Sequence, residues 1–146
     1  MKSLFIAVYI LLINQLFCQN PVKWHTTYNS KKNILHFSAK IDADWHLYAS
    51  YVPEPNEGPL PTLFSFTGSK RYNLIDSIIQ LEPITQYDKN FGINLAYYEN
   101  SALFSQNIKP LKNKFKIEGD IKYMTCNDST CIPGEYSFKV KIKSLN

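Results

Sequence analysis

The amino-acid sequence predicts an all-β fold, an antiparallel β-sandwich of the immunoglobulin-like type. Apolar and polar residues alternate through several stretches of the chain, as they do in strands that bury one face. Turn-forming residues interrupt these stretches at short intervals, and no stretch has a convincing helical period. We count about eight or nine short strands after the first 19 residues, a number that suits two packed antiparallel sheets.

Residues 1–19 are predicted to be a secretory signal peptide, and residues 20–146 the domain itself. Lys2 precedes an almost unbroken apolar run from position 3 to 13, which is too short for a spanning helix of about 20 residues. We expect cleavage close to Cys18, with lipidation of that cysteine or an uncleaved anchor as alternatives. The domain is therefore expected to be periplasmic or otherwise exported, in an oxidising compartment.

The first predicted strands form a hairpin. They cover residues 24–28 and 34–41, and the polar segment 29–33 between them is typical of a hairpin loop. One face of the second strand is wholly apolar and consists of Leu35, Phe37, Ala39 and Ile41. This alternation predicts a strand that turns one face to the core.

The middle of the chain gives weaker signals. Residues 53–61 cannot form a regular strand, because their prolines lack a backbone donor. The apolar run at 63–67 is predicted as a strand, whereas 74–81 leaves the choice between strand and helix open. Residues 88–92 form a further predicted loop, with an aromatic residue at its tip.

Two alternating stretches near the end of the chain, residues 115–123 and 136–142, are predicted to pair as an antiparallel hairpin. The lysines of the second stretch alternate with its apolar residues. Since the net charge is only +4, these lysines indicate a solvated strand face rather than a nucleic-acid-binding stripe.

Cys126 and Cys131 flank the connection between these two strands, and they are the cysteines that remain once Cys18 is removed. Such positions can bring two Cα atoms within the roughly 4.4–6.8 Å that a disulfide needs. The loop that this disulfide would close is small and stabilises the fold little, which favours thiol–disulfide exchange over a structural role. A merely structural disulfide stays open as the alternative.

No metal or other cofactor is expected besides a redox-active disulfide. A zinc site would need two more ligands, and the three histidines show no ligand spacing.

The segment 123–133 resembles the active-site segment of the N-terminal periplasmic domain of the thiol:disulfide interchange protein DsbD, in its stand-alone, Bacteroidetes-like version. Three more stretches resemble parts of that domain: the tryptophan/tyrosine strand at 45–48, the Gly-Pro-hydrophobic-Pro-Thr element at 58–62 and the cap region at 87–92, with 104–106 following at the usual place. The resemblance runs from about Asn20 to Ile142.

This resemblance implies an immunoglobulin-like sandwich that relays electrons. A membrane-embedded thiol reductase would be the donor. Periplasmic thioredoxin-fold proteins would be the acceptors, among them disulfide isomerases and cytochrome c maturation thioredoxins. By position, Cys131 would attack partner disulfides and Cys126 would resolve the mixed disulfide.

The resemblance also implies a cap over the cysteines, formed by residues 88–92 with Phe91 as the lid. Tyr48 would pack against the pair from below, although it can equally be a core aromatic. Asp88 can be a turn residue or a modulator of a nearby pKa. His46 is expected to be a structural polar residue.

Two departures from the family pattern leave other functions open. The cysteine spacing is shorter than in the classical member, and the chain ends at Asn146 without a donor or thioredoxin domain, so we expect a separate protein to supply electrons. One alternative is a non-enzymatic immunoglobulin-like binding module with a structural disulfide. Another is a redox-inert component of cytochrome c maturation or envelope assembly.

Overall fold

The computed structural model describes residues 20–52, 58–89 and 91–143, and this part of the chain is all β. The predicted signal peptide and part of the proline-rich loop lie outside the described residues. Ten strands follow one another: β1 (Val22–Asn29), β2 (Ile34–Ile41), β3 (His46–Tyr48), β4 (Leu63–Phe66), β5 (Tyr72–Gln80), β6 (Ile84–Asp88), β7 (Ile93–Tyr98), β8 (Ser101–Pro110), β9 (Lys114–Cys126) and β10 (Cys131–Lys143). In these ranges no helix is long and apolar enough to cross a membrane.

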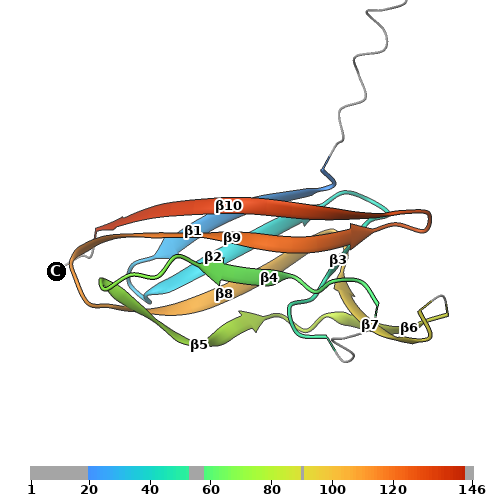
Figure 1. Ribbon diagram of the computed structural model, residues 1–146, viewed down its shortest axis with the longest axis horizontal. Coiled ribbons are helices and arrows are strands. Elements are labelled where there is room, and N and C mark those ends of the chain that lie inside the picture. Colours follow the sequence, from blue (N-terminus) through green and yellow to red (C-terminus); the bar gives the residue numbers. More distant parts are fainter. Residues whose placement is uncertain (1–19, 53–57, 90, 144–146) are drawn as a thin grey trace, which may run out of the picture.

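The strands form two antiparallel sheets, which confirms the predicted sandwich (Figure 1). One sheet has four strands in the order β1-β2-β8-β5. The other has six, in the order β10-β9-β3-β7-β6, with β4 paired to β9 beside that path. The turn between β9 and β10 and the tip of the β6–β7 hairpin lie at the same end of the molecule (Figure 1).

The first hairpin agrees with its prediction, and residues 74–80 of the ambiguous segment 74–81 belong to a strand. In the β1–β2 turn, the Asn29 side chain accepts hydrogen bonds from the backbone amides of the next lysines, Lys31 and Lys32. Strand β5 pairs with β8, but its register shifts between Ile75 and Ile79. Asp76 lies in this irregularity with a φ of 59°. A bulge of this kind breaks the alternation of faces, which explains why the sequence pattern was ambiguous.

The main core fills the space between the two sheets. Its most buried side chains come from both sheets and include Leu35, Phe37, Leu47, Phe104, Ile117 and Ile121, each 0% exposed. The predicted apolar face of β2 lies entirely within this core. The apolar residues that alternate at 115–123 in β9 and at 136–142 in β10 also face it, as their alternation predicted.

A second, smaller apolar cluster lies outside this core. It consists of Tyr48, Ile93, Leu95, Tyr97 and Cys126, with Met124 packed against it, and is called the outer cluster below. Successive strand residues point to opposite faces of a sheet. Because Ile121 and Tyr123 of β9 face the main core, Met124 and Cys126 face the other side. The outer cluster therefore covers the outer face of the six-stranded sheet at one end.

Candidate redox site

The two cysteines close the end of the longest hairpin. Cys126 is the last residue of β9 and Cys131 the first of β10, and they are register partners. They form a disulfide with an S–S distance of 2.00 Å and a Cα–Cα distance of 4.0 Å. The predicted hairpin is thus confirmed, with the Cα atoms slightly closer than the expected range.

Asn127 holds the tight turn that brings the cysteines together. Its backbone amide donates to the carbonyl oxygen of Thr130 at 2.9 Å. Its side-chain oxygen accepts from the amides of Ser129 and Thr130, each at 2.9 Å. An asparagine that satisfies turn amides in this way favours a fixed hairpin end. The disulfide is therefore presented on a defined turn.

The two sulfur-bearing residues differ in exposure. Cys126 is only 4% exposed and belongs to the outer cluster, whereas Cys131 is exposed. A thiolate from another protein must approach a disulfide sulfur directly to attack it. The arrangement therefore offers Cys131 to a partner and keeps Cys126 within the protein.

Tyr48 lies in the outer cluster with Cys126, on the strand next to β9. It is 4% exposed. Burial raises the pKa of Tyr48 to about 12, and the negative charges of Asp88 and ionised Tyr97 add to the effect. The phenol is consequently neutral at physiological pH. Tyr48 and Cys126 thus share one cluster, and a shielding role for Tyr48 stays a prediction.

The segment 58–62 is hydrogen-bonded to the backbone at Tyr48 and Ala49, and it covers part of the outer cluster. The buried hydroxyl of Thr62 donates to the carbonyl oxygen of Tyr48 at 2.5 Å, and the Thr62 amide donates to that of Ala49 at 3.1 Å. Gly58 has a φ of 78°, and a Cβ there would lie 2.9 Å from Cδ1 of Ile93. The glycine is therefore required both by its backbone conformation and by its close approach to the cluster.

Asp88 is a turn residue in the β6–β7 hairpin. Its carboxylate accepts from the amide of Phe91 at 3.1 Å, and its carbonyl oxygen accepts from the amide of Gly92 at 2.8 Å. Its charge also contributes to the raised pKa values of Tyr48 and Tyr97, after burial. Asp88 is therefore a turn residue, and a role in shielding the cysteines stays a prediction. The Phe91 side chain is 45% exposed in this conformation, and its role as a lid remains a prediction.

Sequence reasoning missed much of the wall around Cys126. Strand β7 contributes Ile93, Leu95 and Tyr97 to the outer cluster, while Ala96 and Tyr98 face the main core. The available signal was an apolar run with no clear alternation, which is typical of a strand covered on both faces. It indicates double burial but does not show what covers the second face.

His46 and Glu99 stand beside the cysteines. His46 is the register partner of Cys126 across β3 and β9. Its ring stacks on Tyr97 with a centroid distance of 4.3 Å, and its Nε2 lies 3.1 Å from Oε1 of Glu99. The neighbouring Trp45 packs against the main core instead.

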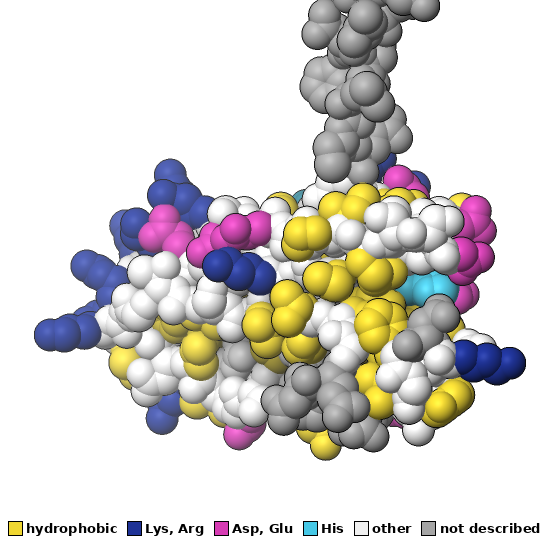
Figure 2. Space-filling model, turned by 45° about the vertical axis from the view of Figure 1, so that its right-hand side comes forward, with side chains coloured by type: hydrophobic (Ala, Val, Ile, Leu, Met, Phe, Trp, Pro, Cys, Tyr) yellow, Lys and Arg dark blue, Asp and Glu magenta, His cyan; other side chains and the backbone are white. Residues whose placement is uncertain are grey.

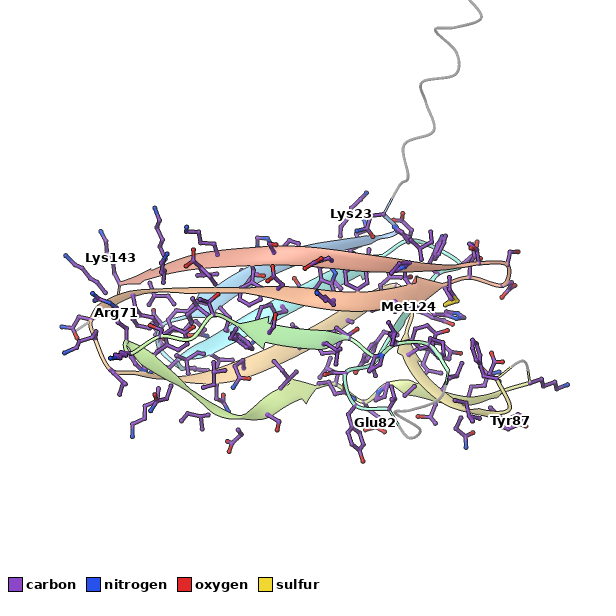
Figure 3. All side chains as sticks on the ribbon, in the orientation of Figure 1. Lys23, Arg71, Glu82, Tyr87, Met124 and Lys143 are labelled. Atoms are coloured by element: carbon purple, nitrogen blue, oxygen red, sulfur yellow. A yellow bond between two sulfur atoms is a disulfide. The ribbon has the colours of Figure 1, made fainter. Side chains whose placement is uncertain are left out.

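Two clefts open at this end of the molecule. Both are lined by His46, Glu99 and Asp128, and their volumes are about 350 and 470 Å³. The smaller one also has Asp42 and Asp44 in its wall. Acidic side chains gather beside a histidine at this end, while most lysine and arginine side chains lie toward the other (Figure 2). Met124 and Tyr87 lie at the same acidic end (Figure 3).

Comparisons with known proteins agree with this site. The family model described as "Thiol:disulfide interchange protein DsbD, N-terminal" matches residues 15–142. The chain superposes on the reduced DsbD N-terminal domain of Neisseria meningitidis with a TM-score of 0.62 and 10% identity, covering 89% of this chain and 92% of that one.

A second solved structure holds the complex between the DsbD N-terminal and PilB N-terminal domains from Neisseria meningitidis. Its matching chain gives a TM-score of 0.61 and 9% identity, covering 86% of this chain and 87% of that one. A search of curated proteins finds no match. The structural likeness establishes the shared fold, and the family match covers most of the chain, the disulfide included. The chain therefore belongs to the family of N-terminal domains of the thiol:disulfide interchange protein DsbD.

Proposed function

We propose that this domain is an exported electron relay that works through the Cys126–Cys131 pair. It would take electrons from a membrane-embedded thiol reductase and pass them to periplasmic thioredoxin-fold proteins, in disulfide reduction or isomerisation or in cytochrome c maturation. The observation that carries the proposal is the unequal exposure of the two cysteines within one disulfide. A relay needs one sulfur that partners reach and a second that resolves the mixed disulfide.

The electron transfer follows from ordinary thiol–disulfide chemistry. In the reduced pair, the Cys131 thiolate attacks a partner disulfide, which forms a mixed disulfide and releases one partner thiolate. The Cys126 thiol loses its proton and attacks the Cys131 sulfur, which expels the second partner thiolate. Two electrons thereby pass to the partner, the Cys126–Cys131 disulfide re-forms, and the two partner thiolates take up protons equal in number to those that Cys131 and Cys126 have released. The reverse sequence recharges the domain, and no metal or organic cofactor takes part.

Protein partners and export are part of this proposal. A DsbD N-terminal domain of similar fold forms a complex with the N-terminal domain of PilB, which supports a protein as the reaction partner. We propose that residues 1–19 direct export to the periplasm and are then cleaved.

A cap would protect the reduced pair between partners. We propose that residues 88–92 form it, with Phe91 as the lid and Asp88 holding the turn. The support is that the same hairpin, through Ile93 and Leu95, packs in the outer cluster with Cys126.

A trapping experiment tests the relay. The full chain carries Cys18→Ser, so that only the pair can react, together with Cys126→Ala. After reduction and mixing with an oxidised thioredoxin, this variant should accumulate a mixed disulfide through Cys131, visible on non-reducing gels and by mass spectrometry. The matched Cys131→Ala variant should accumulate far less, because its remaining thiol is buried. Equal absence of adducts from both variants would favour the binding-module alternative.

A further inference from the structure

We propose that His46, positioned by Glu99, accepts and returns the proton of Cys126 during thiol–disulfide exchange. This inference rests on the relay function proposed above and assigns a role to a residue that the sequence alone indicated as structural. Of the described histidines, His25 and His36 lie on the four-stranded sheet, and His36 bonds to Ser105 there. His46 alone lies next to the cysteines on the six-stranded sheet.

Cys131, Cys126 and His46 form a row across neighbouring strands. Cys131 pairs with Cys126, and Cys126 pairs with His46. Directly opposed residues of antiparallel strands have Cβ atoms about 4.5–5.5 Å apart and point to the same face. The stacking of His46 on Tyr97, a member of the outer cluster, shows that the imidazole is on the Cys126 side of the sheet.

The imidazole ring and backbone of His46 are held from several directions. Tyr97 covers one face with an interplanar angle of 26°, and Glu99 lies 3.1 Å from Nε2. The His46 carbonyl oxygen accepts a hydrogen bond from the hydroxyl of Thr125 at 2.9 Å, which ties its backbone to the residue before Cys126. When Nε2 donates to Glu99, the neutral ring carries its free lone pair on Nδ1. Nδ1 is then the proton acceptor.

The charges around His46 suit this role. An imidazolium at this position would share the two clefts with acidic side chains from several elements, namely Asp42, Asp44, Asp88, Glu99 and Asp128. The larger cleft also contains one lysine, Lys89. The titratable groups next to it are Tyr97, which stacks on the ring, Tyr48, two residues along β3, and, when reduced, its register partner Cys126. Burial raises the pKa of Tyr48 to about 12, so its phenol does not accept the proton at neutral pH. Glu99 is the carboxylate that partners the ring directly, at 3.1 Å from Nε2.

The proton balance is simple. After Cys131 forms the mixed disulfide, the Cys126 S–H bond breaks and its proton passes to Nδ1 of His46. The Cys126 thiolate forms the S–S bond to Cys131 and expels the partner thiolate, which takes a proton from solvent or from His46. In the recharging direction, Cys126 leaves as a thiolate and His46 returns the proton to it. The imidazolium stabilises that thiolate, as cationic neighbours of reactive cysteines do.

The two attacks can be observed separately with 5,5′-dithiobis(2-nitrobenzoate). The reduced full chain with Cys18→Ser should release one equivalent of thionitrobenzoate when Cys131 attacks and a second when Cys126 resolves the adduct. The Cys126→Ala variant should release only the first, which assigns the phases. Stopped-flow traces between pH 5 and 10 then give the pH at which the second phase reaches half its maximum rate.

In the wild type we expect that midpoint to lie well below about 8.5, the value for a free thiol. His46→Phe preserves stacking on Tyr97 but removes the base, and it should raise the midpoint by at least about one pH unit. The second phase at pH 7 would then slow about tenfold or more, with the first phase unchanged. His46→Gln should behave alike, and Glu99→Gln should give a smaller shift in the same direction. His36→Phe is the matched control and should change neither phase.

Unchanged midpoints in both His46 variants, or a wild-type midpoint at about 8.5, would overturn the assignment of His46 while leaving the relay intact. The relay itself would fail differently. In that case the Cys126→Ala variant would form no mixed disulfide with oxidised thioredoxin in the trapping experiment, and the role of His46 would fall with the relay.

Discussion

The main core and the outer cluster are both apolar, but they are built for different tasks. The main core lies between the sheets and is filled by side chains such as Phe37, Phe104 and Leu47 that expose nothing. The outer cluster lies on the opposite face of the six-stranded sheet and contains two tyrosines and a cysteine. Its exposed fractions run from 4% for Tyr48 and Cys126 to 9% for Ile93.

This difference separates stability from reactivity. Because the core is close-packed, any change of side-chain volume there lowers the stability of the fold. The core also supplies most of the free energy of folding. The outer cluster is small and ends at the disulfide. Its main effect is therefore to shield Cys126 from solvent while Cys131 stays exposed to a partner. Changes in the first region should cost stability, and changes in the second should alter thiol chemistry.

The largest expected effect comes from a matched pair of leucines. Leu47→Ala removes a side chain with 0% exposure from the main core, and Leu95→Ala removes one with 7% exposure from the outer cluster. We expect the first to lower the free energy of unfolding by about 4 kcal/mol and the second by about 2 kcal/mol. Urea titrations measure both.

The same two variants should also differ in the rate at which their reduced cysteines are oxidised. Leu95→Ala should speed the oxidation of the reduced cysteines, because it loosens the packing around Cys126, whereas folded Leu47→Ala should not. Equal losses of unfolding free energy and equal oxidation rates in the two variants would contradict the division between the two regions.

The next largest effect on stability is expected from a glycine of the β9–β10 hairpin. At Gly119 of β9, a Cβ would collide with the backbone carbonyl oxygen of Ser65 and lie 2.7 Å from the Phe138 ring. Gly119→Ala should therefore cost about 1–3 kcal/mol of unfolding free energy through overpacking. Gly68→Ala is the control, since a Cβ there meets nothing within 4 Å and its cost should stay within about 0.5 kcal/mol. Similar costs at both glycines would show that the β4–β9 contact is looser than described.

Reducing the disulfide should have a modest effect on stability. Cys126 and Cys131 are five positions apart, and the chain-entropy account gives about 2 kcal/mol for so small a loop. Denaturation of the oxidised and dithiothreitol-reduced chain, both with Cys18→Ser, measures this difference. A loss of about 5 kcal/mol or unfolding on reduction would instead mark the bond as a structural staple.

The smallest effect is a pH dependence shared by the two regions. Burial raises the pKa of Tyr48 in the outer cluster and of Tyr98 in the main core to about 12, with Asp88 and Tyr97 adding to the first and Glu82 to the second. Between pH 10 and 12 the unfolded chain releases these protons and the folded chain retains them. Stability should thus fall as pH rises through that window.

Tyr48→Phe and Tyr98→Phe should each make the fall shallower. Short urea unfolding measurements at pH 9, 10 and 11 check this, with the difference from wild type removing the shared contribution of lysines. If the free energy of unfolding falls with pH as steeply in both variants as in the wild type, these phenols ionise freely in the folded protein.

The sequence was most informative where one face of a strand is buried. Strands β2, β9 and β10 alternate cleanly, so their core faces and the hairpin that carries the cysteines could be predicted. The alternation fails in β5, which has a bulge, and in β7, which is covered on both faces. The strand count of eight or nine accordingly fell short of the ten described.

The site was predictable only in part. Cys126 and Cys131 lie close together in the sequence, so their pairing followed from the hairpin. The contact between His46 and Glu99 depends on how β3 pairs with both β7 and β9, which is a long-range property that no local pattern contains. The same long-range pairing places β7 in the wall around Cys126.

The reduction potential of the Cys126–Cys131 pair tests the central claim most directly. It can be measured by equilibrating the full chain with Cys18→Ser in glutathione and dithiothreitol buffers and quantifying free thiols. A relay that exchanges electrons with thioredoxin-fold proteins should have a potential between roughly −270 and −120 mV. A potential well below about −300 mV would mean a structural disulfide and would contradict the relay.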